Sequence, residues 1–203
     1  MPTAIAINCS LKATGPARSS TDRLLNEVTA ALAREGVVVA ETIRIADHDV
    51  KTGVEADMGD GDAWPALRDR ILAADILVFG TPIWLGHLSS VAQRVLERFD
   101  ALFSEIDAQG RTPASGRIAV VAVVGNEDGG HHVASQLMQG LNDVGFTIPA
   151  GGAVYWVGEA MHKIDYIDLA ETPEAVAGAT ATLAANAAHL AGFLSGARYP
   201  GTC

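Results

Sequence analysis

Apolar residues along this chain fall into two patterns that alternate from the N-terminus to the C-terminus. Continuous apolar runs lie within residues 3–9, 75–82 and 116–125, and such runs are typical of strands buried on both faces of a sheet. Residues 37–45 and 152–157 are strand-like as well. The runs therefore predict five strands in a parallel sheet that is covered on both faces.

Helical periodicity fills the segments between and after these runs, because apolar residues there recur at spacings of three and four. The predicted helices cover residues 19–36, 63–74, 89–103, 131–145 and 172–196. Ser19 and Asp22 resemble a capping box at the start of the first helix. Thr172 is the expected N-cap of the last helix, with Pro173 as its first helical residue.

Five strands alternate with five helices, so the predicted fold is a flavodoxin-like, doubly wound α/β domain over residues 1–203. The expected strand order is 2-1-3-4-5, with helices on both faces of the sheet. Ligands of such sheets bind beyond the carboxyl ends of the strands, near the switch between the first and third strands. The loops after the first, third and fourth strands are therefore the candidate functional loops.

The first of these loops, residues 10–22, carries hydroxyl groups at both ends. Ser10 follows the first strand, and Ser19, Ser20 and Thr21 open the first helix. A helix N-terminus offers free N–H groups and the positive end of the helix dipole, so this loop suits an anion such as a phosphate. The alternative is that Ser19 or Ser20 is an ordinary N-cap.

The second loop, residues 80–90, combines apolar and aromatic side chains with glycine. Its candidate ligand-binding residues are Pro82, Ile83, Trp84, Leu85 and Gly86. A tryptophan at the carboxyl edge of a parallel sheet favours contact with a planar apolar ring, and glycine allows close approach of the backbone. The alternative is that Trp84 covers a core edge or an oligomer contact.

The third loop, residues 124–132, is rich in glycine and acidic residues. Its candidate ligand-binding residues are Gly125, Asn126, Glu127, Asp128, Gly129 and Gly130. His131 and His132 follow, but adjacent residues on a helix point about 100° apart and no third ligand is obvious, which disfavours a metal. The role of the two histidines stays open, and one of them could cap or hydrogen-bond locally.

Composition narrows the range of partners. A formal net charge of −10 argues against nucleic acid or an anionic membrane, since both need a basic surface. No stretch approaches the ~18 apolar residues of a membrane span, and the N-terminus lacks the basic region of a secretory signal. We therefore expect a cytoplasmic protein. The acidic residues within 55–62 are interpreted as a solvated loop.

The two cysteines, Cys9 and Cys203, lie at opposite ends of the chain without metal-ligand spacing. A disulfide between them is disfavoured. Small tyrosine phosphatases place a nucleophilic cysteine at the end of the first strand, in a C-x5-R-[ST] loop, but here eight residues separate Cys9 from Arg18. A thiolate needs its arginine and its cradle of amides at set distances, so the spacing disfavours a phosphatase.

Two further classes are disfavoured by the loops. No G-x-G-x-x-G follows the first strand, which argues against classical dinucleotide binding. A receiver-like or purely structural domain would not need the glycine-rich loops after the third and fourth strands.

Three segments together resemble the superfamily of flavodoxin-like NAD(P)H-dependent FMN reductases and flavodoxins. They read INCSLKATGPARSSTDRLL, ILAADILVFGTPIWLGHLSSVAQRVLERFD and VVAVVGNEDGGHHVASQLMQGLNDVGFTI. The resemblance extends over residues 3–160, and the second segment is the most specific part of it. It implies that the hydroxyls of the first loop surround the phosphate of FMN. The candidate residues of the second loop would flank the isoalloxazine ring, and those of the third would close its other side.

The activity implied by this resemblance is electron transfer from NADH or NADPH through FMN to a quinone, a flavin or another aromatic small molecule. The flavin would carry the chemistry, so no catalytic side chain is expected. The alternative is a flavodoxin-type electron carrier without a substrate site of its own. The sequence leaves open the acceptor and the choice of nicotinamide nucleotide.

The chain departs from the family's pattern at three places. Trp84 stands where many relatives carry tyrosine, so stacking is kept without a phenol hydroxyl. The segment between the second strand and the second helix lacks a cysteine cluster, which excludes an iron–sulfur cluster there. The first loop is also longer than usual. The apolar residues 152–162 would, by resemblance, cover the flavin of a neighbouring subunit, and a homodimer or homotetramer is left open.

Overall fold

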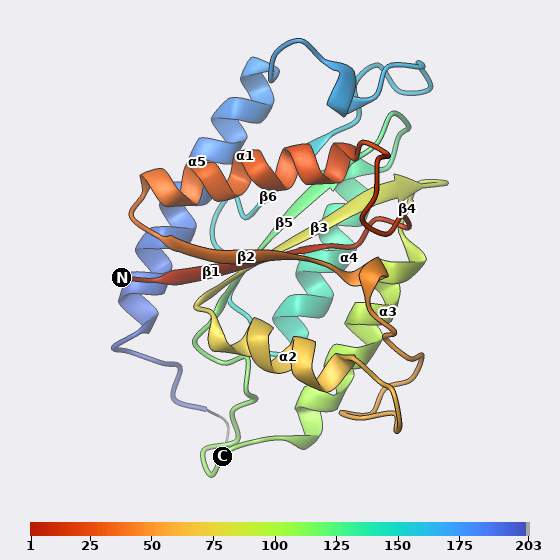
Figure 1. The fold of residues 1–203 in the computed structure, drawn as a ribbon. Coiled ribbons are helices and arrows are strands. Elements are labelled where there is room, and N and C mark those ends of the chain that lie inside the picture. Colours follow the sequence, from red (N-terminus) through yellow and green to blue (C-terminus); the bar gives the residue numbers. More distant parts are fainter. Residues whose placement is uncertain (202–203) are drawn as a thin grey trace.

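The computed structural model describes residues 1–201 and shows a parallel sheet with helices on both faces (Figure 1). The strands are β1 (Thr3–Asn8), β2 (Val38–Arg44), β3 (Ile76–Trp84), β4 (His87–Leu88), β5 (Ile118–Val124) and β6 (Ala153–Trp156). Five of them run parallel in the order β2-β1-β3-β5-β6, and the short β4 pairs antiparallel with the end of β3. The predicted flavodoxin-like order is thus confirmed, because the numbering differs only through β4.

The helices are α1 (Ser20–Arg34), α2 (Trp64–Ala73), α3 (Ser90–Phe99), α4 (Gly130–Asp143) and α5 (Glu174–Leu194), with short 3-10 turns at Ile45–Asp47, Asp100–Ser104 and Tyr166–Asp168. Helices α1 and α5 cover one face of the sheet, and α2, α3 and α4 cover the other (Figure 1). Within residues 1–201, no helix combines the length and the apolar character needed to cross a membrane.

Strand β1 shows why the two faces pack differently. Successive side chains of a strand point to opposite faces, so Ala4 and Ala6 face α1 and α5 whereas Ile5 and Ile7 face the other core. Small residues let α1 lie close to the sheet. A Cβ atom added at Gly80 of β3 would lie only 2.8 Å from the Leu25 side chain of α1.

The predicted helix starts were confirmed at α1 and wrong at α5. Ser19 is the N-cap of α1, and its Oγ accepts from the Asp22 amide at 3.2 Å. At α5 the N-cap is Pro173, without a capping side chain. The Thr172 hydroxyl precedes this N-cap and donates to Glu27 Oε1 of α1 at 2.7 Å.

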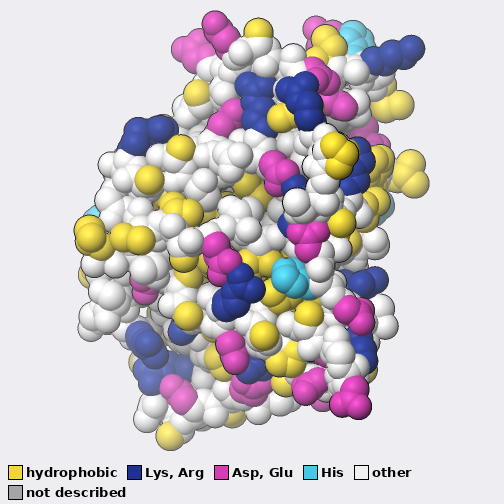
Figure 2. Space-filling model, in the orientation of Figure 1, with side chains coloured by type: hydrophobic (Ala, Val, Ile, Leu, Met, Phe, Trp, Pro, Cys, Tyr) yellow, Lys and Arg dark blue, Asp and Glu magenta, His cyan; other side chains and the backbone are white. Residues whose placement is uncertain are grey.

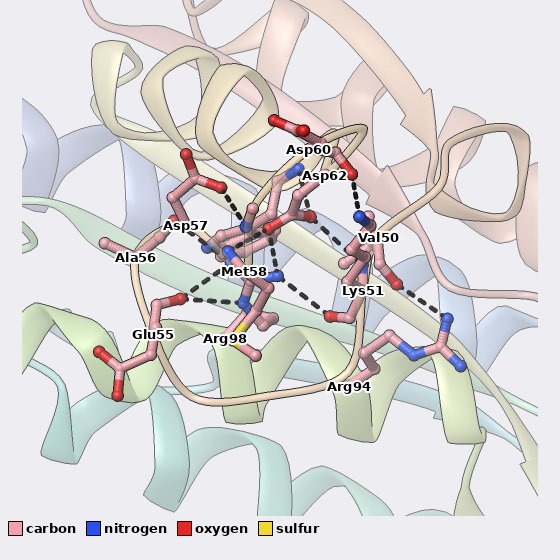
Figure 3. Close-up of polar contacts among 12 residues, drawn as sticks. Val50, Lys51, Glu55, Ala56, Asp57, Met58, Asp60, Asp62, Arg94 and Arg98 are labelled. Atoms are coloured by element: carbon pink, nitrogen blue, oxygen red, sulfur yellow. Dashed lines mark hydrogen bonds and ion pairs between the residues drawn. The ribbon is translucent and has the colours of Figure 1, made fainter.

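The loop between β2 and α2 closes over a buried ion pair (Figure 3). Arg98 of α3 lies 2.7 Å from Asp62, measured between Nη1 and Oδ2, and both side chains are fully buried. The Arg98 guanidinium also donates to the carbonyls of Lys51 at 3.0 Å, Glu55 at 2.8 Å and Ala56 at 3.2 Å. Residues 55–62 are therefore not simply a solvated loop, because this arginine holds the loop against the core.

The Asp62 carboxyl owes its ionised state to the contacts around it. Burial alone would raise its pKa, but hydrogen bonds from the Met58 amide and the Arg98 guanidinium outweigh burial and lower the pKa from 3.8 to about 2. The amides of Lys51 and Trp64 also donate to this carboxylate. Since the folded state holds the proton less tightly than the unfolded chain, the stabilisation is complete above the unfolded pKa and is lost as the pH falls toward the folded one.

We therefore expect acid to weaken the folded state partly through Asp62. The free energy of unfolding should fall more steeply between pH 3.8 and pH 2 in the unmodified protein than in an Asp62→Asn variant. Urea denaturation at a series of pH values measures both slopes. Asp69→Asn is the matched control, because the Asp69 side chain is 74% exposed and should leave the slope unchanged. Equal slopes for the protein and Asp62→Asn would contradict this assignment.

Candidate functional site

The three candidate loops meet at the carboxyl edge of the sheet (Figure 1). Ser89, at the end of the second loop, donates through Oγ to the Cys9 carbonyl at 2.5 Å and so ties that loop to the end of β1. The Leu85 amide donates to Glu127 Oε1 at 2.9 Å and ties the second loop to the third. Parallel packing of β1, β3 and β5 brings these loops together, as the strand order predicts.

The four hydroxyls of the first loop have different surroundings. Ser10 is nearly buried, and its Oγ accepts from Arg44 Nη1 at 2.8 Å. Ser19 caps α1, and the Ser20 hydroxyl accepts from the Ile167 amide at 3.2 Å. Thr21 is only 2% exposed. Ser20 and Thr21 are the first two residues of α1, and amides at these positions have no acceptor within a helix.

The second loop is a tight hairpin that presents an aromatic side chain. Leu85 and Gly86 have φ angles of 52° and 76° and connect β3 to β4, which is the pattern of a type I′ turn. Trp84 is 52% exposed and Leu85 is 90% exposed. Ile83, by contrast, is buried in the core. Of the predicted ring-flanking residues, the hairpin therefore exposes Trp84 and Leu85 and withdraws Ile83.

The glycines of the third loop allow close packing against its neighbours. A Cβ atom added at Gly125 would lie 2.9 Å from Ile83, and one at Gly129 would lie 2.8 Å from the Gly86 backbone. Gly129 also has a φ of 117° and precedes α4 as its N-cap. Sequence alone suggested that these glycines bend the backbone around a ligand. The structure gives a different reason for them, namely contact between the third loop and the hairpin.

The polar residues of the third loop also hold neighbouring segments. Asn126 Nδ2 donates to Asp165 Oδ1 at 2.9 Å, and the Asn126 carbonyl accepts from the Met161 amide at 2.7 Å. Asp128 accepts from the Gly129 amide through Oδ1 at 2.7 Å. The two Asn126 contacts link the third loop to the segment that follows β6.

The rings of the two histidines after this loop have different aromatic neighbours. The His132 ring packs edge-on against His87 of β4, with 5.4 Å between ring centroids, and His131 lies near Tyr155. No group of three histidine, cysteine or acidic residues suited to a metal ion occurs within residues 1–201. His132 thus borders the hairpin, whereas His131 lies beside β6.

Cys9 is fully buried, and burial raises the pKa of its thiol well above the ordinary value. A thiolate nucleophile needs the opposite, a lowered pKa and access to solvent. Arg18, which would have to assist it, pairs with Asp168 at 2.8 Å. The geometry therefore argues against phosphatase chemistry. Cys203 lies outside the described residues.

Sequence reasoning missed three polar residues around Ser10. Asn8 ends β1, Asp22 lies in the first turn of α1, and Arg44 ends β2. All three hydrogen-bond with one another or with Ser10. The position of Arg44 could have been found from the sequence, because the carboxyl ends of neighbouring parallel strands share an edge.

A groove of about 650 Å³ lies between α1 and α5, away from the hairpin. Basic and acidic side chains mix on this face (Figure 2), and Arg23 and Glu27 form an ion pair within the groove at 3.1 Å. The Tyr166 hydroxyl donates to the same glutamate. Of the predicted site residues, Ser19 lines this groove.

Comparisons with known proteins show the family and the fold of this chain. A model of the family described as NADPH-dependent FMN reductase matches residues 2–162. The 8-demethyl-8-aminoriboflavin-5′-phosphate synthase of Streptomyces davaonensis is 33% identical over 175 residues, which cover 81% of this chain and 67% of that protein. A protein of Mycobacterium bovis named divalent metal cation transporter MntH is 41% identical over 169 residues. The match covers 81% of this chain but only 24% of that relative's length.

Solved structures with the same fold also match this chain. The crystal structure of RosB with the bound intermediate 8-demethyl-8-formylriboflavin-5′-phosphate superposes with a TM-score of 0.87 at 31% identity, covering 98% of this chain and 82% of that one. A flavone reductase shares the fold with a TM-score of 0.65 at 16% identity, over 98% of this chain and 66% of that one. The chain belongs to the NADPH-dependent FMN reductase family of flavodoxin-like flavoproteins.

Proposed function

We propose that this chain binds FMN at the carboxyl edge of its sheet and passes electrons from NADH or NADPH to a quinone, a flavin or another aromatic acceptor. The observation that supports this most directly is the meeting of two features at one edge. The N-terminus of α1 with its hydroxyls suits a phosphate, and the exposed Trp84 hairpin suits a flat ring.

The residues present fit FMN at both ends. Amides of the first turn of α1 and the Ser10 and Ser19 hydroxyls supply donors for a phosphate without a dedicated metal ion. An indole that is half exposed can cover a planar ring and shield it from water. Pro82 and Gly86 would complete that side, and residues 125–130 would border the other.

When bound, FMN would supply the hydride and electron chemistry. The protein's own part would be to bind, orient and shield. Glu127 would keep the hairpin in place through the Leu85 amide, so that Trp84 holds one position. The Ser10 and Ser19 hydroxyls would fix the phosphate end. The proposal requires no side chain as a general acid or base.

A visible spectrum followed by anaerobic titration tests this function. Purified protein, or apoprotein with added FMN, should show bound flavin absorption, and either NADH or NADPH should bleach it. Colourless protein that takes up no FMN would rule out the proposal. Bound flavin that neither nucleotide reduces would favour the electron-carrier alternative.

Two relatives whose matches cover most of this chain suggest a second candidate function. One is named a synthase of 8-demethyl-8-aminoriboflavin-5′-phosphate, and the other holds a flavin phosphate with a formyl group at position 8. In that case the flavin phosphate would be the substrate rather than the cofactor. Mass spectrometry of flavin recovered after aerobic incubation with an added amino donor separates the two functions, because a reductase returns FMN of unchanged mass.

A further inference from the structure

Four residues form a closed ring of hydrogen bonds where β1 passes into the first loop. The Ser10 amide donates to Asn8 Oδ1 at 2.8 Å, and Asn8 Nδ2 donates to Asp22. Arg44 donates to the other oxygen of Asp22 through Nη2 and to Ser10 Oγ through Nη1, the latter at 2.8 Å. The ring joins the ends of β1 and β2 to the first turn of α1.

The donor and acceptor roles in this ring determine which way the Ser10 hydroxyl hydrogen can point. A guanidinium only donates, so Ser10 Oγ must accept from Arg44. The hydroxyl hydrogen then remains for a different acceptor, and the described residues offer it no hydrogen-bonded partner. Ser10 is also only 8% exposed, so its backbone and side chain have little freedom to turn away. The ring therefore prepares Ser10 as a donor before any ligand binds.

The ring also neutralises a carboxylate that would otherwise repel a phosphate. Asp22 lies in the first turn of α1, where a carboxylate is favourable for the helix but would repel a phosphate at the same N-terminus. The Arg44 side chain is 13% exposed and pairs directly with this carboxylate. The pair cancels the charge of Asp22, so that the helix N-terminus can still attract an anion.

We propose that Arg44 is a positioning residue for the phosphate of the flavin. It presets the Ser10 hydroxyl as a donor and neutralises Asp22, and it thereby makes the site prefer FMN over riboflavin. This inference rests on the proposed binding of FMN at the sheet edge. It adds to that function a determinant for the phosphorylated form, which comes from β2 rather than from the first loop.

The test compares FMN and riboflavin affinities of the apoprotein by quenching of flavin fluorescence. Arg44→Gln should weaken FMN binding roughly 10- to 100-fold, the range for a lost charge-assisted hydrogen bond. Riboflavin affinity should change less than about twofold, and Arg44→Lys should restore part of the FMN affinity. Arg70→Gln is the matched control, since it breaks the partly exposed Arg70–Glu41 pair between α2 and β2 and should alter neither affinity.

A second variant separates this role from a merely structural one. Arg44→Gln combined with Asp22→Asn should bind FMN more tightly than Arg44→Gln alone, because it removes the uncompensated carboxylate. A purely structural ring predicts a further loss instead. Equal losses for FMN and riboflavin, or no loss in Arg44→Gln, would overturn this inference while leaving the proposed function intact. An unmodified protein that binds neither flavin would overturn both.

Discussion

Replacing Arg98 with methionine is expected to destabilise the protein by about 3–5 kcal/mol, the usual effect of removing one partner of a buried ion pair. Methionine keeps much of the length of the stem but has no charge and no donors. Asp62 would stay buried without its cation, and the carbonyls of Lys51, Glu55 and Ala56 would lose their donor. Chemical denaturation, with the change in the free energy of unfolding as readout, measures the effect.

Arg94→Met provides the control for this experiment from the same helix. Arg94 makes one comparable bond to the same loop, from Nη1 to the Val50 carbonyl at 3.0 Å. Its loss should cost only about 1 kcal/mol. If Arg98→Met proved as stable as Arg94→Met, the buried pair would not hold the loop as described.

Replacing Trp84 with alanine is expected to weaken FMN binding roughly 5- to 100-fold. Stacking of a nucleobase on an aromatic side chain contributes about 1–3 kcal/mol, and the isoalloxazine ring offers a comparable flat surface. The folded state should change little, because the indole is 52% exposed. Titration of the apoprotein with FMN, followed by fluorescence, gives the dissociation constant directly.

Two variants make this result specific. Phe103→Ala removes another aromatic side chain that is 51% exposed, but from the 3-10 turn after α3, and FMN affinity should not change. Cys9→Ala should likewise affect FMN less than Trp84→Ala does, since the thiol is buried in the core. The reverse ranking of Cys9 and Trp84 would point back to thiol chemistry.

The sequence predicts the parts of this protein that depend on short-range patterns. Continuous apolar runs located β1, β3 and β5, and the serine before α1 located its N-cap. The assignment of Thr172 as an N-cap failed, since Pro173 is the N-cap and the Thr172 hydroxyl instead contacts Glu27, far away in the sequence. A local rule cannot weigh a partner that only the packing of α1 against the segment before α5 brings near.

The candidate site also combines features that the sequence pattern predicts with features that only packing creates. Its three loops follow from the strand order, whereas the ring around Ser10 joins positions 8, 10, 22 and 44. No spacing rule links these positions, and Asp22 by itself resembles an ordinary helix-start acid. Arg98 and Asp62 are similar, since only the folded loop reveals that an acidic, polar segment contains a buried carboxylate.

Leu85, at the tip of the hairpin, has a backbone conformation that is unfavourable for leucine. A φ of 52° lies in the left-handed region, which asparagine and glycine adopt more readily. A leucine there costs about 1 kcal/mol of conformational energy. Leu85 gains no burial in return, because 90% of its side chain faces solvent. Under the proposed function, its apolar surface beside Trp84 would be covered by the bound flavin and so would contribute to binding rather than to the stability of the hairpin.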